Sequence, residues 1–107
     1  MMRRTPNLDA LFGALAHPTR RAILERLGRG PAGTSALAQP FDMALPSFVQ
    51  HLAILEACGL VRSMKLGRIR MYRLVPPTLK FAGKWLAKAG RPEWQARLAK
   101  ASRQPIR

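Results

Sequence analysis

The stretch from Leu45 to Val61 constrains the fold most, because its apolar residues recur at the spacing of a helix. At 100° per residue, one side of such a helix carries Phe48, Leu52, Leu55 and Gly59. The opposite side carries Ser47, Gln50, His51 and Ile54. Pro46 suits a first helical turn, and Gly59 suits the left-handed position after a helix end. We predict one helix with an apolar side that packs on a core and a second side free for another role.

Directly after this helix the residue pattern changes from helical to alternating. The runs 60–65 and 69–75 each alternate apolar with polar or charged side chains, and the connection 66–68 contains Gly67. Two alternating runs around a glycine-containing connection are typical of a β-hairpin. Pro76 and Pro77 end the second run.

Helical spacing also marks the segments before this unit. Leu8, Leu11, Phe12 and Leu15 predict a first helix over about 8–16, with Asn7 as its cap. Pro18 opens a second helix, which ends in the glycine-rich run 28–33. Thr34 or Ser35 is expected to cap a short third helix that stops near Gln39, because Pro40 disfavours helical geometry there.

A last long helix follows Pro76 and Pro77 and ends near Ala89, and one or two further helical turns are expected over about 93–102. The predicted order is helix, helix, short helix, turn, helix, hairpin, helix. This mainly α (α+β) arrangement of about five helices with one β-hairpin wing is a winged helix-turn-helix. We expect a single domain over 1–107, with a core of about 8–89 and a basic C-terminal extension of about 90–107.

The charge balance indicates a polyanionic partner. Lysine and arginine together number 19 against five acidic residues, which gives a net charge of +14. No run approaches the roughly 18 consecutive apolar residues of a membrane span, so we expect a cytoplasmic protein with no membrane partner. Because Cys58 is the single cysteine, a disulfide within the chain is ruled out. We expect its small side chain to be buried. A redox switch through a disulfide between subunits stays open.

The polar side of the predicted fourth helix is suited to reading double-stranded DNA. Gln50 could pair bidentately with adenine, Ser47 could reach a phosphate or a base, and Ile54 could touch a thymine methyl group. His51 is expected to contact DNA or its backbone. The alternative is an ordinary solvated helix face, and for His51 a plain surface histidine.

The predicted hairpin strengthens the DNA interpretation. No acidic residue occurs from Ala57 to Pro92, whereas the hairpin carries several basic ones. Arg68 at its tip is placed to enter a minor groove, with Lys65 and Arg70 near phosphates. Arg62 belongs to the same basic set.

Several segments together resemble the ArsR/SmtB group of bacterial winged-helix transcriptional regulators. They are Ala16-His-Pro-Thr-Arg-Arg-Ala-Ile-Leu24, Val49-Gln-His-Leu-Ala-Ile-Leu55, Gly59-Leu-Val61, and Gly67-Arg68 followed by Tyr72-Arg-Leu74. The resemblance covers about residues 8–89. It implies that the fourth helix reads the major groove and that the start of the second helix, with Arg20 or Arg21, lies near the DNA backbone.

The same resemblance implies a homodimer formed by the first and last helices. Its contacts would be Leu8, Leu11, Phe12, Leu15, Leu79, Trp85 and Leu86. The alternative from the residues alone is that these side chains close the core of one protomer. The chain departs from the family pattern at Val49, where many relatives carry serine, and in lacking the cysteine pairs or Asp and His ligands of metal-sensing members.

Other chemistry has little support in the sequence. Only His17, His51 and Cys58 offer nitrogen or sulfur ligands, and their spacing matches no metal motif, so we expect no metal and no cofactor. The scattered carboxylates and the absence of a phosphate loop or nucleophile elbow argue against an enzyme. The sequence therefore predicts a sequence-specific, dimeric transcriptional repressor that binds an inverted repeat, with an unknown effector. A protein-interaction module or a non-specific nucleic-acid binder on the same scaffold is the alternative.

Overall fold

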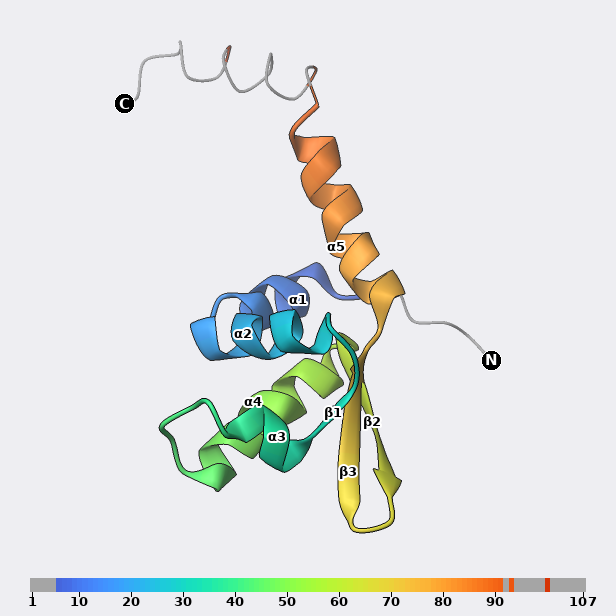
Figure 1. Cartoon of the computed structure of the whole chain (residues 1–107). Coiled ribbons are helices and arrows are strands. Elements are labelled where there is room, and N and C mark those ends of the chain that lie inside the picture. The colour runs from blue at the N-terminus through green and yellow to red at the C-terminus, as the bar shows by residue number, and fades with distance from the viewer. Residues whose placement is uncertain (1–5, 92, 94–99, 101–107) are drawn as a thin grey trace.

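The computed structural model describes residues 6–91, 93 and 100. In this part of the chain the helices are α1 (Leu8–Leu15), α2 (Pro18–Leu27), α3 (Thr34–Ala38), α4 (Leu45–Ala57) and α5 (Pro76–Ala89). The strands are β1 (Ala32–Gly33), β2 (Val61–Leu66) and β3 (Ile69–Leu74). The predicted winged helix-turn-helix order is confirmed (Figure 1). The helical turns expected over 93–102 lie outside the described residues, apart from two isolated positions.

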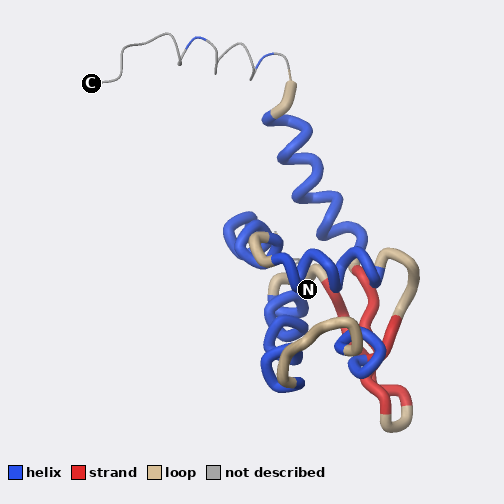
Figure 2. The backbone as a smooth tube through the Cα atoms, turned by 60° about the vertical axis from the view of Figure 1, so that its left-hand side comes forward, coloured by secondary structure: helices blue, strands red, loops and turns tan. Residues whose placement is uncertain are grey.

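The core lies where α1, α2, α3 and α4 meet the base of the hairpin. Leu11, Ile23, Leu37, Phe48 and Leu60 are among its fully buried large side chains. The three strands form one antiparallel sheet in the order β1-β3-β2. Helix α5 begins at this core and extends away from it in both views (Figures 1 and 2).

The helix ends follow the predicted chemistry in part. The Asn7 side chain accepts a hydrogen bond from the backbone N–H of Ala10 at 3.1 Å, which confirms it as the cap of α1. The expectation that Thr34 or Ser35 caps α3 is wrong. Gly33 occupies the cap position without a side-chain bond, because it is also the last residue of β1.

Strand β1 was not predicted from the sequence. Ala32 and Gly33 pair with Tyr72 and Met71 of β3. A side-chain carbon at Gly33 would come within 2.9 Å of the Ile69 side chain, so a larger residue here would require that side chain to move. This pairing joins the segment between α2 and α3 to the hairpin.

Candidate nucleic-acid interface

Helix α4 has one buried side and one exposed side, as its sequence predicts. Phe48, Leu52 and Leu55 are completely buried, whereas Ser47 and Gln50 are exposed. Ile54 keeps 43% of its surface accessible. The exposed surface is more apolar than expected, because it also includes Leu45 and Val49, which are 53% and 40% exposed. The N-terminal half of α4 and the hairpin tip lie toward the same end of the molecule, away from α5 (Figure 1).

His51 occupies a different position from the other residues of the polar side. It is half-buried, its ring lies 4.4 Å from that of His17, and its Nδ1 is 3.1 Å from the guanidinium of Arg20. Burial lowers the pKa of His51 below its ordinary value, and the neighbouring His17 and Arg20 lower it further. The structure thus gives His51 partners within the protein at the joint between α2 and α4.

Arg20 connects three helices. Its guanidinium donates to the carbonyl oxygens of Ala14 at 2.7 Å and Gly13 at 3.2 Å, in addition to the His51 contact. These carbonyls belong to the last turn of α1, and that of Gly13 also accepts a hydrogen bond from the backbone N–H of Ala16 at 3.2 Å. The expectation that Arg20 points toward the DNA backbone does not agree with this position. Arg21 similarly donates to the carbonyl of Leu15 at 2.7 Å.

One face of the hairpin forms hydrogen bonds with the C-terminal end of α4. Ser63 donates hydrogen bonds from its N–H and its hydroxyl to the carboxylate of Glu56, at 3.0 and 2.8 Å. Arg70 in turn donates to the Ser63 hydroxyl at 3.1 Å. Lys65 lies directly across from Arg70 in the strand register, so both cations share this face. We call it the inner face of the wing.

The phenol of Tyr72 belongs to the inner face, near the base of the wing. Burial raises the pKa of Tyr72, and the nearby Glu56 carboxylate raises it further. The side chain is buried in the core, so it anchors the base of the wing and its register.

The basic residues of the wing do not all lie together. Arg68 is exposed at the hairpin tip, where Gly67 adopts a positive φ of 64°. Arg62, in contrast, lies at the base of the hairpin, directly opposite Arg73 and on the other face from Lys65 and Arg70. The grouping of Arg62 with the DNA-contacting cations therefore does not agree with the structure. No sequence pattern singles out Arg73, because only the strand register places it beside Arg62.

The residues expected at a dimer interface fall into three groups. Leu11 is completely buried in the protomer, so its assignment as a partner contact is wrong and the core alternative holds for it. Leu8, Phe12, Leu15 and Leu79 are partly buried against the core. Trp85 and Leu86 on α5 remain 45% and 54% exposed, and the Trp85 ring meets that of Phe12 edge-on at 5.7 Å.

Three further expectations concern the burial of Cys58, a metal site and a membrane-spanning helix. Cys58 is half-buried rather than fully buried, and its thiol donates to the Leu55 carbonyl at 3.4 Å. Within the described residues, no three His, Cys, Asp or Glu side chains are grouped to hold a metal ion. None of the described helices is long and apolar enough to cross a membrane.

Comparison with known proteins agrees with this architecture. A helix-turn-helix domain family matches residues 15–63. The HTH-type transcriptional regulator Rv2034 of Mycobacterium tuberculosis is 41% identical over 71 residues, which cover 66% of each chain. A crystal structure of an ArsR family transcriptional regulator shares 46% identity and a TM-score of 0.74, over 87% of this chain and 96% of that one. This chain belongs to the ArsR family of transcriptional regulators.

Two other relatives extend the comparison. The transcriptional repressor SdpR of Bacillus subtilis is 29% identical over 79 residues, which cover 74% of this chain and 88% of SdpR. The winged helix-turn-helix DNA-binding domain Mb0332 of Mycobacterium bovis, described as homodimeric, is 27% identical with a TM-score of 0.63. That match covers 77% of this chain and 79% of the domain. The ArsR family consists of DNA-binding regulators and not of enzymes, which confirms the expectation from the sequence.

Proposed function

We propose that this ArsR family protein is a cytoplasmic repressor that binds an inverted repeat in double-stranded DNA as a homodimer. The observation that carries the proposal is the exposed side of α4, with Ser47 and Gln50, beside a wing that turns Lys65 and Arg70 toward the same helix. A helix of this kind enters the major groove in helix-turn-helix proteins, and a basic hairpin beside it meets the backbone and the minor groove. The net charge of +14 supports the same partner.

In this proposal the exposed residues of α4 read bases and the wing holds the backbone. Gln50 pairs with a base edge, Ser47 contacts a base or a phosphate, and Ile54 packs on a thymine methyl group. Lys65 and Arg70 neutralise phosphates, and Arg68 enters the minor groove from the hairpin tip. His51 acts mainly through Arg20, by holding α4 against α2.

The proposed dimer uses the apolar surface that the protomer leaves uncovered. Trp85 and Leu86 lie on α5 with about half of their surface exposed, and the Phe12 ring lies beside that of Trp85. Exposed large apolar side chains grouped on one helix are typical of a subunit interface. Homodimerisation of the Mb0332 domain supports this assignment.

The test is selection from a randomised DNA duplex library at about 150 mM salt, where purely electrostatic binding is weakened. We expect enrichment of an inverted repeat whose half-site centres lie about 10 base pairs apart. The variant Gln50→Ala should relax one base position by about 1–3 kcal/mol, because a bidentate contact is lost. Gln39→Ala, an exposed glutamine after α3, is the matched control and should leave discrimination unchanged.

If Gln50→Ala still discriminates between bases at every position of the enriched DNA site, the assignment of base reading to Gln50 is overturned. Binding without any enriched sequence, which disappears as salt rises, would overturn the proposed sequence-specific function.

A further inference from the structure

The wing has a second face that the proposed function does not use. It carries three cross-strand pairs in order from base to tip, which are Arg62 with Arg73, Met64 with Met71, and Leu66 with Ile69. We call these six residues the outer face. They alternate along each strand with the inner-face residues that contact α4.

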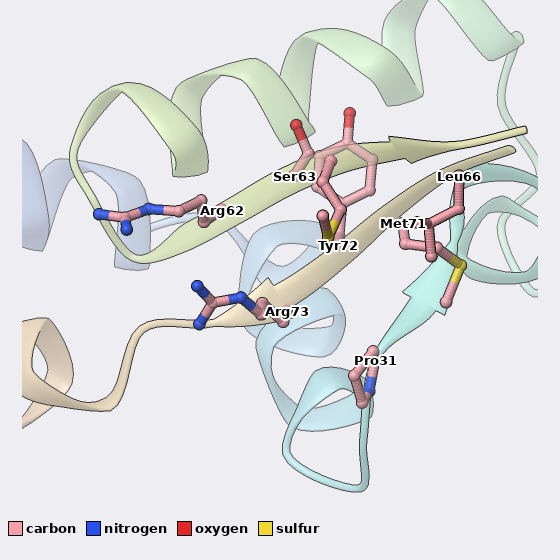
Figure 3. A pocket seen from close by; sticks show the side chains of 8 residues that line it. Pro31, Arg62, Ser63, Leu66, Met71, Tyr72 and Arg73 are labelled. Carbon is pink, nitrogen blue, oxygen red and sulfur yellow. The ribbon is translucent and has the colours of Figure 1, made fainter.

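The outer face is both apolar and hollowed. Met64 is 57% exposed, Leu66 54% and Ile69 56%. A cavity of about 420 Å³ lies here, lined by Pro31 and five residues of this face, with Ser63 and Tyr72 also contributing to its lining. Figure 3 shows the side chains of Arg62 and Arg73 extending in the same direction at one end of the cavity, with Leu66 and Met71 at the other. The volume is within the range of about 300–1,000 Å³ that is typical of small-molecule sites.

Within the described part of the chain, the two arginines have no counterion. Among the described residues, neither guanidinium forms a hydrogen bond or an ion pair. The one carboxylate of the wing region, Glu56, is held by Ser63 on the inner face. Like charges directly opposite each other on neighbouring strands are destabilising. A bound anion would remove this repulsion, and guanidinium groups are suited to binding a carboxylate.

Arg62 and Arg73 lie apart from the proposed DNA contacts. Arg62 and Arg73 lie at the base of the hairpin, at the opposite end of the strands from Arg68. They also lie on the face turned away from Ser63, and therefore from the contact with α4. A duplex bound to α4 and to the hairpin tip would meet Lys65 and Arg70 before it met this pair.

We propose that the outer face binds a small amphipathic carboxylate, with its charged head between Arg62 and Arg73 and its apolar body along Met64, Met71 and Pro31. The order of side chains along the face matches such a ligand, since two cations are followed by two thioethers and then two aliphatic groups. Methionine side chains adapt to ligands of varied shape, which suits a flexible chain. The proposal concerns a surface separate from the DNA interface and does not depend on the proposed operator.

The test is isothermal titration calorimetry of the full chain with sodium octanoate as the probe. Acetate tests the charged head alone, and 1-octanol tests the apolar body alone. We expect octanoate to bind with a dissociation constant of about 1 mM or below, and each control to bind at least about tenfold more weakly. Arg73→Gln should weaken octanoate binding about tenfold or more, whereas Arg29→Gln, an exposed arginine elsewhere, should leave it unchanged.

A second variant tests the apolar half without altering charge. Leu66 is exposed near the tip, so Leu66→Gln is compatible with folding and should weaken octanoate but not acetate. Folding of each variant is checked by far-ultraviolet circular dichroism.

Three results would overturn the proposal. One is the absence of octanoate binding to the wild-type protein at millimolar concentrations. Another is equal binding of acetate, which would indicate a simple anion site. The third is a loss of DNA affinity in Arg73→Gln with octanoate binding retained, which would assign Arg73 to DNA.

Discussion

Replacing Arg20 with alanine distinguishes a structural arginine from one that holds a phosphate. The guanidinium donates to two carbonyls in the last turn of α1 and contacts His51 of α4. Each hydrogen bond to a charged group contributes about 1.5–3 kcal/mol where it is well buried. Because Arg20 is only half-buried, solvent reduces these contributions, and we expect Arg20→Ala to lower the free energy of unfolding by about 2 kcal/mol.

The assay is urea unfolding followed by circular dichroism, together with the salt dependence of DNA affinity. Arg21→Ala is the matched control, because Arg21 makes one exposed bond to Leu15 and should contribute only about 0.5 kcal/mol. If Arg20 has only a structural role, Arg20→Ala should leave the slope of log DNA affinity against log salt concentration unchanged. Each phosphate contact, in contrast, contributes about −0.9 to that slope. Unchanged stability together with a slope shallower by about one unit would refute our interpretation of Arg20.

Three further variants test the core, the histidine pair and the dimer. Phe48→Ala removes a fully buried ring and should lower the free energy of unfolding by about 3–5 kcal/mol. The control Val49→Ala changes an exposed residue and should alter the free energy of unfolding by less than about 0.5 kcal/mol. Equal urea midpoints for the two variants would contradict this prediction. Because the pKa of His51 is lowered in the folded protein, its contribution to stability is complete above its ordinary value of 6.5 and is lost as the pH falls below it. His51→Gln keeps an acceptor for Arg20, so its melting temperature should fall less than that of the wild type between about pH 7.5 and 5.5, and an identical fall would exclude His51 as the cause. Leu86→Glu places a charge on the exposed part of α5 and should convert the dimer to a monomer in sedimentation velocity, with helix content preserved. A dimer that persists would move the interface away from this side chain.

The parts of the fold that follow from local pattern could be predicted from the sequence. The helical spacing of Phe48, Leu52 and Leu55 identified the buried side of α4, and those residues are completely buried. The alternating runs identified the hairpin, whose strands lie within one residue of the predicted bounds. Both signals depend only on residues close together in the chain.

What could not be predicted depends on residues that are distant in the chain. Arg20 and His51 are 31 positions apart in the chain, and no local sequence pattern indicates their contact. The sequence alone therefore assigns both side chains to DNA contacts. Strand β1 is only two residues long and exists because β3 pairs with it. With β1 in place, Gly33 is the N-cap of α3, and the hydroxyl of Thr34 donates to the Arg70 carbonyl at 3.4 Å.

The strand register turns one basic hairpin into two distinct cationic surfaces. Arg70 and Arg73 are three residues apart on β3, an odd number, so their side chains point to opposite faces of the sheet. Each lies opposite another cation, Lys65 or Arg62, and each pair is repulsive in the protein without a ligand. A slip of one residue would exchange the two faces, and the burial of Val61 and Tyr72 at the hairpin base opposes such a slip. Val61 and Tyr72 therefore keep Lys65 and Arg70 on the face toward α4, where we propose that DNA binds. They keep Arg62 and Arg73 on the opposite face, where we propose that a separate anion binds.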